Sequence, residues 1–124
     1  MNEDERRQWI AQIKSALTFP EEIEDDFSGF VADTVMAGLW SRPDLSPRER
    51  SLITIAALTA LDRPHELELH VGLGLDNGLD KKEICEVIMH MAVYGGFPVA
   101  VEGMRIAKEI FDGRGAASSD DVRS

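Results

Sequence analysis

The sequence predicts an all-α protein that folds as a single domain of about six helices. Apolar residues recur every three to four positions along most of the chain, which is the spacing of one helix face. No stretch alternates cleanly between apolar and polar residues, as a half-buried strand would. Proline and glycine fall between the periodic segments, where helices start and stop. A length of 124 residues suits one domain.

Two helices are predicted in the first third of the chain. Trp9 and Ile13 share one face of a first helix that ends before Pro20. A second helix, over residues 23–40, keeps the same spacing. The polar loop 41–45 then separates it from the next element.

The third helix has a strong start signal. Ser46 can cap it, Pro47 suits the first helical position, and Glu49 completes a capping box. The helix runs to about Leu61 and is apolar on nearly every side, so we expect it to be buried at the centre of the fold.

The fourth and fifth helices are bounded by local signals. Pro64 opens the fourth helix, and the pair Asn77-Gly78 ends it with a left-handed cap. Asp80 and Glu83 form the capping box of the fifth helix.

The sixth helix begins at Pro98, after the fifth ends at Gly95-Gly96. The helical domain is predicted to span residues 1–112, and the small and polar residues 113–124 to form a flexible tail. The residues expected to face the core are Ile84, Val87, Ile88 and Met91 in the fifth helix, and Val101, Met104, Ala107, Ile110 and Phe111 in the sixth.

The chain is strongly acidic. Thirteen Lys and Arg residues against 23 Asp and Glu give a formal net charge of −10. A general nucleic-acid or membrane-surface binder would carry the opposite balance, so we expect neither partner. An anionic small molecule is not excluded, because a pocket can differ in sign from the rest of the surface.

Cysteine usage predicts a cytoplasmic protein. Cys85 is the one cysteine, so neither an internal disulfide nor a CxxC redox pair can form. No apolar segment follows the charged residues 1–7, and no apolar run approaches the length of about 20 residues of a membrane span.

The fourth helix carries the first candidate for chemistry. Glu66 and His70 lie one turn apart and share a face with Leu73 and Asn77. Glu66 could hydrogen-bond the imidazole and raise its pKa, which suits proton transfer near neutral pH. The alternative is a surface pair, or a core histidine bonded to a carbonyl.

A second polar stripe lies on the fifth helix, where Glu86, His90 and Tyr94 are each four residues apart. The alternative to a functional role is a hydrogen-bond network between helices.

Three arginines lie near helix ends or loops: Arg42, Arg50 and Arg63. Guanidinium groups there could bind a carboxylate with two hydrogen bonds. The alternative is that each is solvated or paired with an acidic side chain.

Metal and phosphate signatures are missing. The segment from His65 to His70 reads HExxxH, one residue longer than the zinc-binding HExxH. Neither GxxxxGK[ST] nor GxGxxG is present in a suitable place, and Cys85 has no neighbouring cysteine. We therefore expect no metal site.

Several segments of the chain form a distinctive series. They are 39–45 (LWSRPDL), 50–52 (RSL), 66–71 (ELELHV), 77–78 (NG) and 90–98 (HMAVYGGFP). In their order and spacing, these segments together resemble the carboxymuconolactone decarboxylases of the alkylhydroperoxidase D-like superfamily.

This resemblance implies an all-helical bundle that assembles as a homo-oligomer, a trimer or a homohexamer. It also implies a carboxy-lyase that acts without a cofactor on 4-carboxymuconolactone or a related lactone or oxo acid, in protocatechuate-type degradation of aromatic compounds. Trp9 and Trp40 are candidate interface anchors, or ordinary core residues.

Residue roles follow from the resemblance. His70 is expected to deliver a proton, with Glu66 orienting it. The substrate-binding residues are expected to be Arg42, Arg50, Trp40, His90 and Tyr94.

The sequence also departs from its relatives. In the thiol-dependent members, CxxCxxxH aligned on His70 places cysteines at Arg63 and Glu66, so a peroxiredoxin label does not fit this chain. An antioxidant of that type and a non-catalytic oligomeric relative remain the alternatives. Members often carry Asn at Glu102 and Ala at Gly103, and a carboxylate facing an anion site would favour another substrate.

Overall fold

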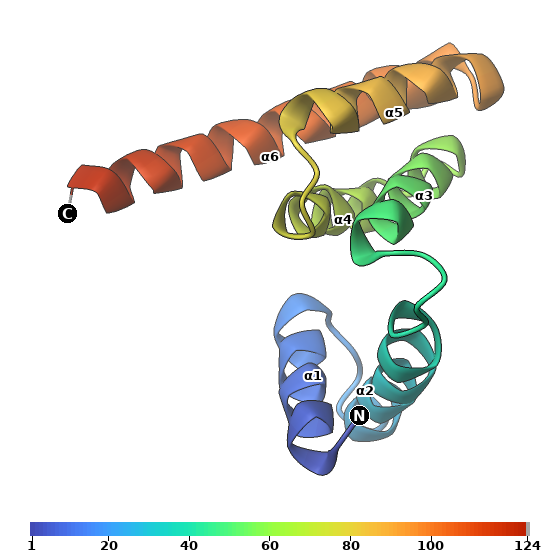
Figure 1. Ribbon diagram of the computed structural model, residues 1–124, viewed down its shortest axis with the longest axis vertical. Coiled ribbons are helices and arrows are strands. Elements are labelled where there is room, and N and C mark those ends of the chain that lie inside the picture. Colours follow the sequence, from blue (N-terminus) through green and yellow to red (C-terminus); the bar gives the residue numbers. More distant parts are fainter. Residues whose placement is uncertain (124) are drawn as a thin grey trace. The chain divides into compact units, whose positions relative to one another are not determined.

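A computed structural model describes residues 1–123, with side chains described up to residue 115. The all-α prediction is confirmed, because these residues form helices and no strand (Figure 1). The chain divides into two compact units, Met1–Ser46 and Pro47–Ser124, which are described one at a time.

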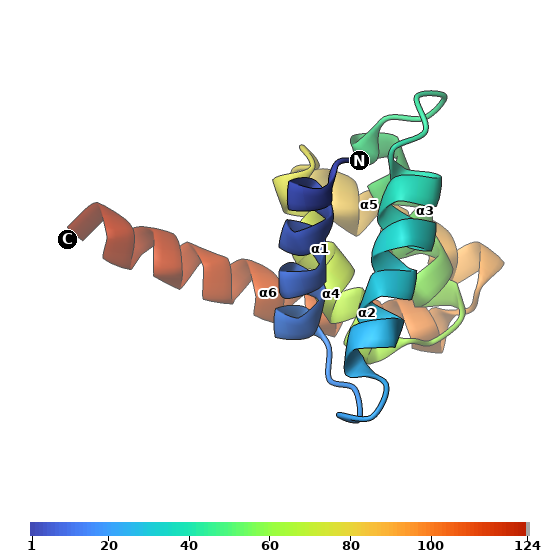
Figure 2. The ribbon, with the colours of Figure 1, turned by 90° about the horizontal axis from the view of Figure 1, so that it is seen from below.

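The first unit contains α1 (Glu3–Ala16), α2 (Glu24–Val31) and η1 (Ala32–Trp40). The last of these continues α2 without a break, as Figure 2 shows from a second side. The predicted helix 23–40 is therefore confirmed in extent, but its second half winds as a π-helix, a rare form whose wider turns often occur near functional sites.

Long-range ion pairs hold the first unit together. Arg6 on α1 donates to both carboxylate oxygens of Asp33 on η1, from Nε at 2.9 Å and Nη2 at 3.2 Å. This contact lowers the pKa of Asp33. Lys14 at the other end of α1 binds Asp25 on α2. Both pairs tie α1 along the continuous α2–η1 helix.

The second unit contains four helices. Their bounds are α3 (Pro47–Ala60), α4 (Pro64–Asp76), α5 (Lys81–Tyr94) and α6 (Phe97–Arg123). Helices α5 and α6 lie side by side as a hairpin, with α3 and α4 packed against it (Figure 1). The capping box of Asp80 and Glu83 is confirmed, and Gly78 has the positive φ, 101°, that the Asn77-Gly78 signal predicted.

A continuous apolar core lies between these four helices. It consists of Ile55, Leu67, Val71, Leu79, Ile84, Ile88, Ala100, Ile106 and Ala107. Two glycines let the hairpin approach α3 closely. A Cβ on Gly95 would lie 3.0 Å from Ala60 Cα, and one on Gly103 would lie 3.0 Å from Ile88 and 3.3 Å from Thr59.

Two predictions of burial are wrong. The third helix is not buried on all sides, since Ile53 and Leu61 are more than half exposed. On α6, Val101 and Met104 face outward, not toward the core. The physical reason is the short distance between α5 and α6, which only small side chains such as Ala100 and Gly103 allow.

The C-terminal segment is helical as far as Arg123, and its predicted flexibility stays a prediction. Within it, Arg114 donates to Asp76 at 2.9 Å and to the carbonyl oxygen of Gly72 at 3.0 Å. These contacts place a cation at the C-terminal end of α4, where the helix dipole favours it. Ser124 lies outside the described residues.

We predict opposite effects for two glycine-to-alanine substitutions. Gly95→Ala places a methyl group against the backbone of Ala60 and should lower the free energy of unfolding by about 1–3 kcal/mol. In Gly113→Ala the added methyl group would meet no atom within 4 Å, and alanine favours the helix more than glycine does. This substitution should therefore raise the free energy of unfolding by about 0.5–1 kcal/mol. Urea unfolding measures both, and equal effects of the two substitutions would contradict the close contact at Gly95.

Candidate active site

His70 is positioned by the way that α4 forms. Pro64 occupies the first turn of the helix, and the spacing of its apolar residues turns Leu67 and Val71 into the core. His70 is adjacent to Val71 and lies half-buried at the edge of this core, whereas Glu66, one turn earlier, is exposed. Glu66 and His70 therefore lie one turn apart on α4, as predicted, and their hydrogen bond stays a prediction.

Burial and charge act on the imidazole of His70 in opposite directions. Desolvation lowers its pKa, and the negative charge of Glu66 raises it. The effect of Glu66 thus has the predicted sign, but the expected net rise is wrong, because burial outweighs the charge of an exposed carboxylate. The net pKa lies below its usual value near 6.5, so the neutral imidazole predominates at pH 7.

A partly buried polar contact lies at the C-terminal end of this helix face. The Asn77 side-chain amide donates to Ser51 Oγ on α3 at 3.0 Å. Ser51 is fully buried, so the bond also satisfies a hydroxyl that would otherwise be costly inside the core. Sequence reasoning placed Asn77 on the His70 face but missed Ser51, whose signal is a polar residue inside an apolar helix.

The second polar stripe lies on the outer side of α5. The rings of His90 and Tyr94 stack with centroids 4.9 Å apart and an interplanar angle of 23°. Both side chains are exposed, and Glu86 on the same face pairs with Lys82 at 3.5 Å. Of the predicted site residues, His90 and Tyr94 are therefore in direct contact with each other.

The remaining predicted residues are divided between the units. In the first unit, Trp40 is half-buried at the end of η1, and Arg42 is exposed with Nη2 3.6 Å from Asp44. In the second unit, Arg50 is half-buried on α3, and Arg63 is exposed at the start of α4. Their convergence on one site stays a prediction.

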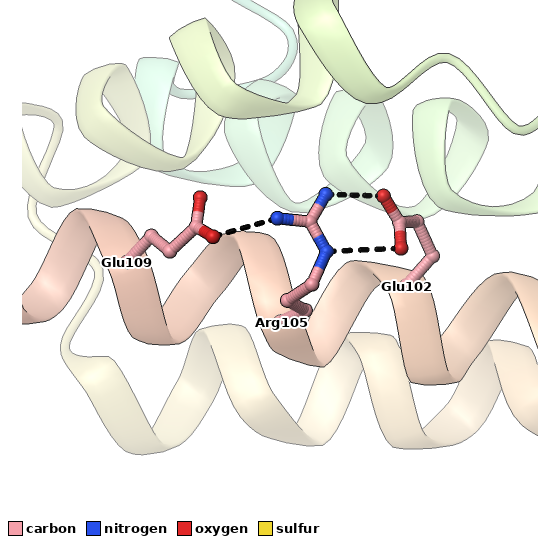
Figure 3. Close-up of polar contacts among 3 residues, drawn as sticks. All are labelled: Glu102, Arg105 and Glu109. Atoms are coloured by element: carbon pink, nitrogen blue, oxygen red, sulfur yellow. Dashed lines mark hydrogen bonds and ion pairs between the residues drawn. The ribbon is translucent and has the colours of Figure 1, made fainter.

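The negative charge of Glu102 is compensated by a neighbouring cation (Figure 3). Arg105 donates from Nε to Glu102 at 3.1 Å, makes a second bond to the same carboxylate, and donates from Nη1 to Glu109 at 2.6 Å. These bonds lower the pKa of Glu102, so it is ionised, with its charge compensated by Arg105. The carboxylate that departs from the family pattern thus has a partner on its own helix.

Other kinds of site find little support in the described part of the chain. No three His, Cys, Asp or Glu side chains there are grouped to hold a metal ion, and Cys85 is a half-buried free thiol. No helix among the described residues has both the length and the apolar character needed to cross a membrane.

Comparison with known proteins identifies the family. The sequence model of the carboxymuconolactone decarboxylase family matches residues 25–109, more than half of the chain. The chain belongs to this family. The matched region includes both units in part, and with them Trp40, Arg42 and His70.

Three similar proteins extend this finding. Over 105 residues the chain is 38% identical to the 4-carboxymuconolactone decarboxylase of Acinetobacter baylyi, which covers 85% of this chain and 78% of that protein. Over 71 residues it is 35% identical to the nitrosuccinic acid decarboxylase of Metarhizium robertsii, covering 57% and 50%. Over 75 residues it is 35% identical to an uncharacterised 15.0 kDa protein of Paracoccus denitrificans, covering 58% and 55%.

These findings confirm the predicted family and support the predicted class of enzyme. Both relatives that are named for an activity are decarboxylases, which supports a carboxy-lyase over the antioxidant and non-catalytic alternatives. The roles of individual residues are not tested by the comparisons and remain predictions.

The lowered pKa of His70 predicts a dependence of stability on pH. Between the folded-state pKa and the unfolded value near 6.5, the unfolded chain binds more protons. This contribution to stability is therefore complete above pH 6.5 and is lost as the pH falls through the folded-state pKa. Replacing His70 by Gln should flatten the slope of unfolding free energy against pH below 6.5.

The matched control is His65→Gln, which removes an exposed histidine from the same helix. Chemical unfolding between pH 5 and pH 8 measures the slope for each variant. If His65→Gln flattens the slope and His70→Gln does not, His70 is not the group responsible.

Proposed function

We propose that this protein is a cofactor-free carboxy-lyase that acts on 4-carboxymuconolactone or a related lactone or oxo acid. The observation that supports it most is the half-buried His70, next to the charge of Glu66, in a chain 38% identical to a named 4-carboxymuconolactone decarboxylase. The titratable group and the relative point to the same reaction class.

The reaction needs two things from the protein. When the bond between carbon and the carboxylate breaks, carbon dioxide leaves and the bonding electron pair spreads into the conjugated lactone. A proton must then be added to a carbon of that conjugated system, so the net change is loss of CO₂ from the carboxylate and gain of one proton. The site therefore needs donors or cations for the developing charge and an acid for the proton.

His70 is the proposed acid, and Glu66 is the group that favours its protonated form. In the free enzyme, burial keeps most of the imidazole neutral at pH 7. A bound substrate carboxylate adds a second negative charge, which raises the imidazole pKa, so the imidazole gains a proton when the substrate binds. The negative charge of Glu66 also favours this protonation.

The substrate carboxylate is proposed to bind Arg42 and Arg50. The exposed guanidinium of Arg42 lies 3.6 Å from Asp44, and exposed ion pairs of this kind are weak. Arg50 is half-buried, where an ion pair is screened less by water. The further contacts proposed for the substrate are a wall from Trp40 and hydrogen bonds from His90 and Tyr94.

The two named relatives suggest which carboxylates to test first. A conjugated lactone and a nitro group both accept an electron pair from the carbon that loses its carboxylate. We therefore propose a substrate whose carboxylate is attached next to such an acceptor. Release of CO₂ from 4-carboxymuconolactone and from nitrosuccinic acid, measured side by side, tests this class.

The protein is further proposed to be a cytoplasmic homo-oligomer, a trimer or a hexamer. The single half-buried thiol of Cys85 suits a reducing compartment. Large exposed apolar side chains on α3, α5 and α6 support assembly, because monomers rarely expose many of them together.

Two substitutions should separate the proton donor from the group that tunes it. His70→Gln should lower kcat on 4-carboxymuconolactone at least about a hundredfold, the lower end of what general acid catalysis contributes. Glu66→Gln removes the charge that raises the His70 pKa, so the fall of kcat/KM with rising pH should move to lower pH. Ultraviolet assays between pH 5 and pH 8 measure both.

Cys85→Ser is the control for this experiment and should retain wild-type decarboxylation. Unchanged turnover in His70→Gln would remove His70 from the mechanism. Hydroperoxide reduction that disappears in Cys85→Ser would instead support the thiol-dependent alternative.

Arg42→Ala should raise KM for 4-carboxymuconolactone or lower kcat/KM by about tenfold or more, the effect of losing a hydrogen bond to a charged group. The matched control is Arg7→Ala, which removes another exposed arginine of the first unit. Steady-state kinetics on both variants gives the comparison, and identical values would exclude Arg42 from substrate binding.

A further inference from the structure

A side-chain hydrogen bond joins α3 to the C-terminal end of α4. The Asn77 amide nitrogen Nδ2 lies 3.0 Å from Ser51 Oγ, and Ser51 is 1% exposed. An amide nitrogen carries two hydrogens, so one N–H remains after this bond is made. Because Asn77 itself is half-buried, its amide lies at the margin of the core, where a bound molecule can reach it.

This amide lies on the same face of α4 as His70. The backbone N–H of Asn77 donates to the carbonyl oxygen of Leu73 at 2.9 Å, so helical spacing continues to this residue. Two helical turns separate His70 from Asn77, which corresponds to about 10 Å between their Cα atoms. Both side chains are half-buried. The face thus presents a titratable group and a neutral hydrogen-bond donor within the length of one small substrate.

Helix α3 borders this face of α4. Residues 61–63 connect the two helices, which pack against each other. An added Cβ on Gly74 would lie 3.0 Å from Ile55 Cδ1, so the helices are in close contact one turn away from the Ser51 bond. Arg50, a proposed carboxylate ligand, directly precedes Ser51 on α3. The proposed acid, this cation and the amide are therefore all carried by two adjacent helices of one unit.

Decarboxylation of a conjugated lactone moves negative charge onto one particular atom. When the bond to the carboxylate breaks, its electron pair moves through the C=C bond onto the lactone carbonyl oxygen, and CO₂ leaves. The acid then adds its proton to the carbon bonded to that carbonyl, which uses the electron pair and restores the C=O bond. The oxyanion and the protonated carbon are near neighbours, so a hydrogen-bond donor beside the acid stabilises the intermediate.

We propose that Asn77 donates its second amide N–H to the lactone carbonyl oxygen while His70 adds the proton to the adjacent carbon. The assignment rests on the proposed function and names the group that binds the acceptor part of the substrate. Ser51 is the positioning residue, because its bond to the first N–H fixes the direction of the second.

A neutral amide suits this task. A hydrogen bond to an ionised oxygen is roughly twice as strong as one to a neutral carbonyl. The bond from Asn77 therefore strengthens as the charge develops and contributes little while the lactone is still neutral. Its loss should lower kcat and leave KM nearly unchanged.

Three variants test the assignment by steady-state kinetics on 4-carboxymuconolactone. Asn77→Ala removes the donor without adding charge, so kcat should fall about a hundredfold, the effect of losing one oxyanion donor, with KM nearly unchanged. Ser51→Ala keeps the amide but releases it, and kcat should fall about tenfold. The matched control is Thr59→Val, which removes another hydroxyl of α3 that is 1% exposed and should keep the wild-type kcat.

NMR measures the same contact without turnover. The probe is muconolactone, the same lactone without the carboxylate that leaves. The chain has two asparagines and two glutamines, so the side-chain amide signal of Asn77 in ¹⁵N-labelled protein is assigned by its absence in Asn77→Ala. Saturating muconolactone should shift one of its two proton signals downfield and leave the other, which is bonded to Ser51, in place.

Wild-type kcat in Asn77→Ala, with circular dichroism showing a folded protein, would overturn the assignment. An equal loss of kcat in Thr59→Val would also overturn it, because any change in the core would then have the same effect. If Asn77→Ala does not fold, Ser51→Ala and the NMR titration decide.

A wild type that releases no CO₂ from 4-carboxymuconolactone would contradict the proposed function on that substrate, and the NMR titration then tests Asn77 independently. An unshifted Asn77 signal would overturn the assignment as well. A shifted signal would support Asn77 as a ligand of the lactone carbonyl even without turnover.

Discussion

The close approach of α3 to the α5–α6 hairpin is the contact on which the second unit depends. Gly95 meets the backbone of Ala60, and Gly103 meets Thr59 and Ile88, at distances where a methyl group would fit only if its neighbours shifted. This contact selects small residues for the inner side of α6 and turns Val101 outward. Val93, Phe97 and Val101 lie outside this contact and stay exposed.

The same packing sets the chemistry of His70. Helix α4 is fixed at its C-terminal end by Asn77, which donates to Ser51, and by Arg114, which donates to Asp76 and to the carbonyl of Gly72. A helix held at this end keeps its half-buried face in place, so the imidazole stays partly desolvated. Because Glu66 is exposed, water screens its charge. Burial of the imidazole therefore outweighs that charge and lowers the pKa of His70.

Local signals explain how much of the fold could be predicted. The ends of α4 and α5 follow from Pro64, Gly78 and the capping box at Asp80, each of which acts within a few residues. The π-helical winding of η1 and the outward turn of Met104 could not be predicted in this way, because they depend on what packs against the helix.

The candidate site shows the same division. Motif spacing identified the family and the pairing of Glu66 with His70, which lie on one helix. It did not find the bond between Ser51 and Asn77, which are 26 residues apart in the chain. It also did not indicate that Arg105 compensates Glu102, because the choice between solvent, substrate and a neighbouring arginine depends on side-chain geometry.

An acidic enzyme that binds an anion must keep some cations exchangeable. Arg105 and Arg114 each make two bonds to one carboxylate, so a substrate would have to break well-formed ion pairs to reach them. Arg42 and Asp44 form a longer, exposed ion pair, which is the weaker kind. In the proposed mechanism, the acid, His70, is mostly neutral in the free enzyme and gains its proton when the charge of a substrate carboxylate is added near it. Substrate binding and protonation of the acid would then be coupled, which explains why a histidine with a lowered pKa can still serve as the proton donor near neutral pH.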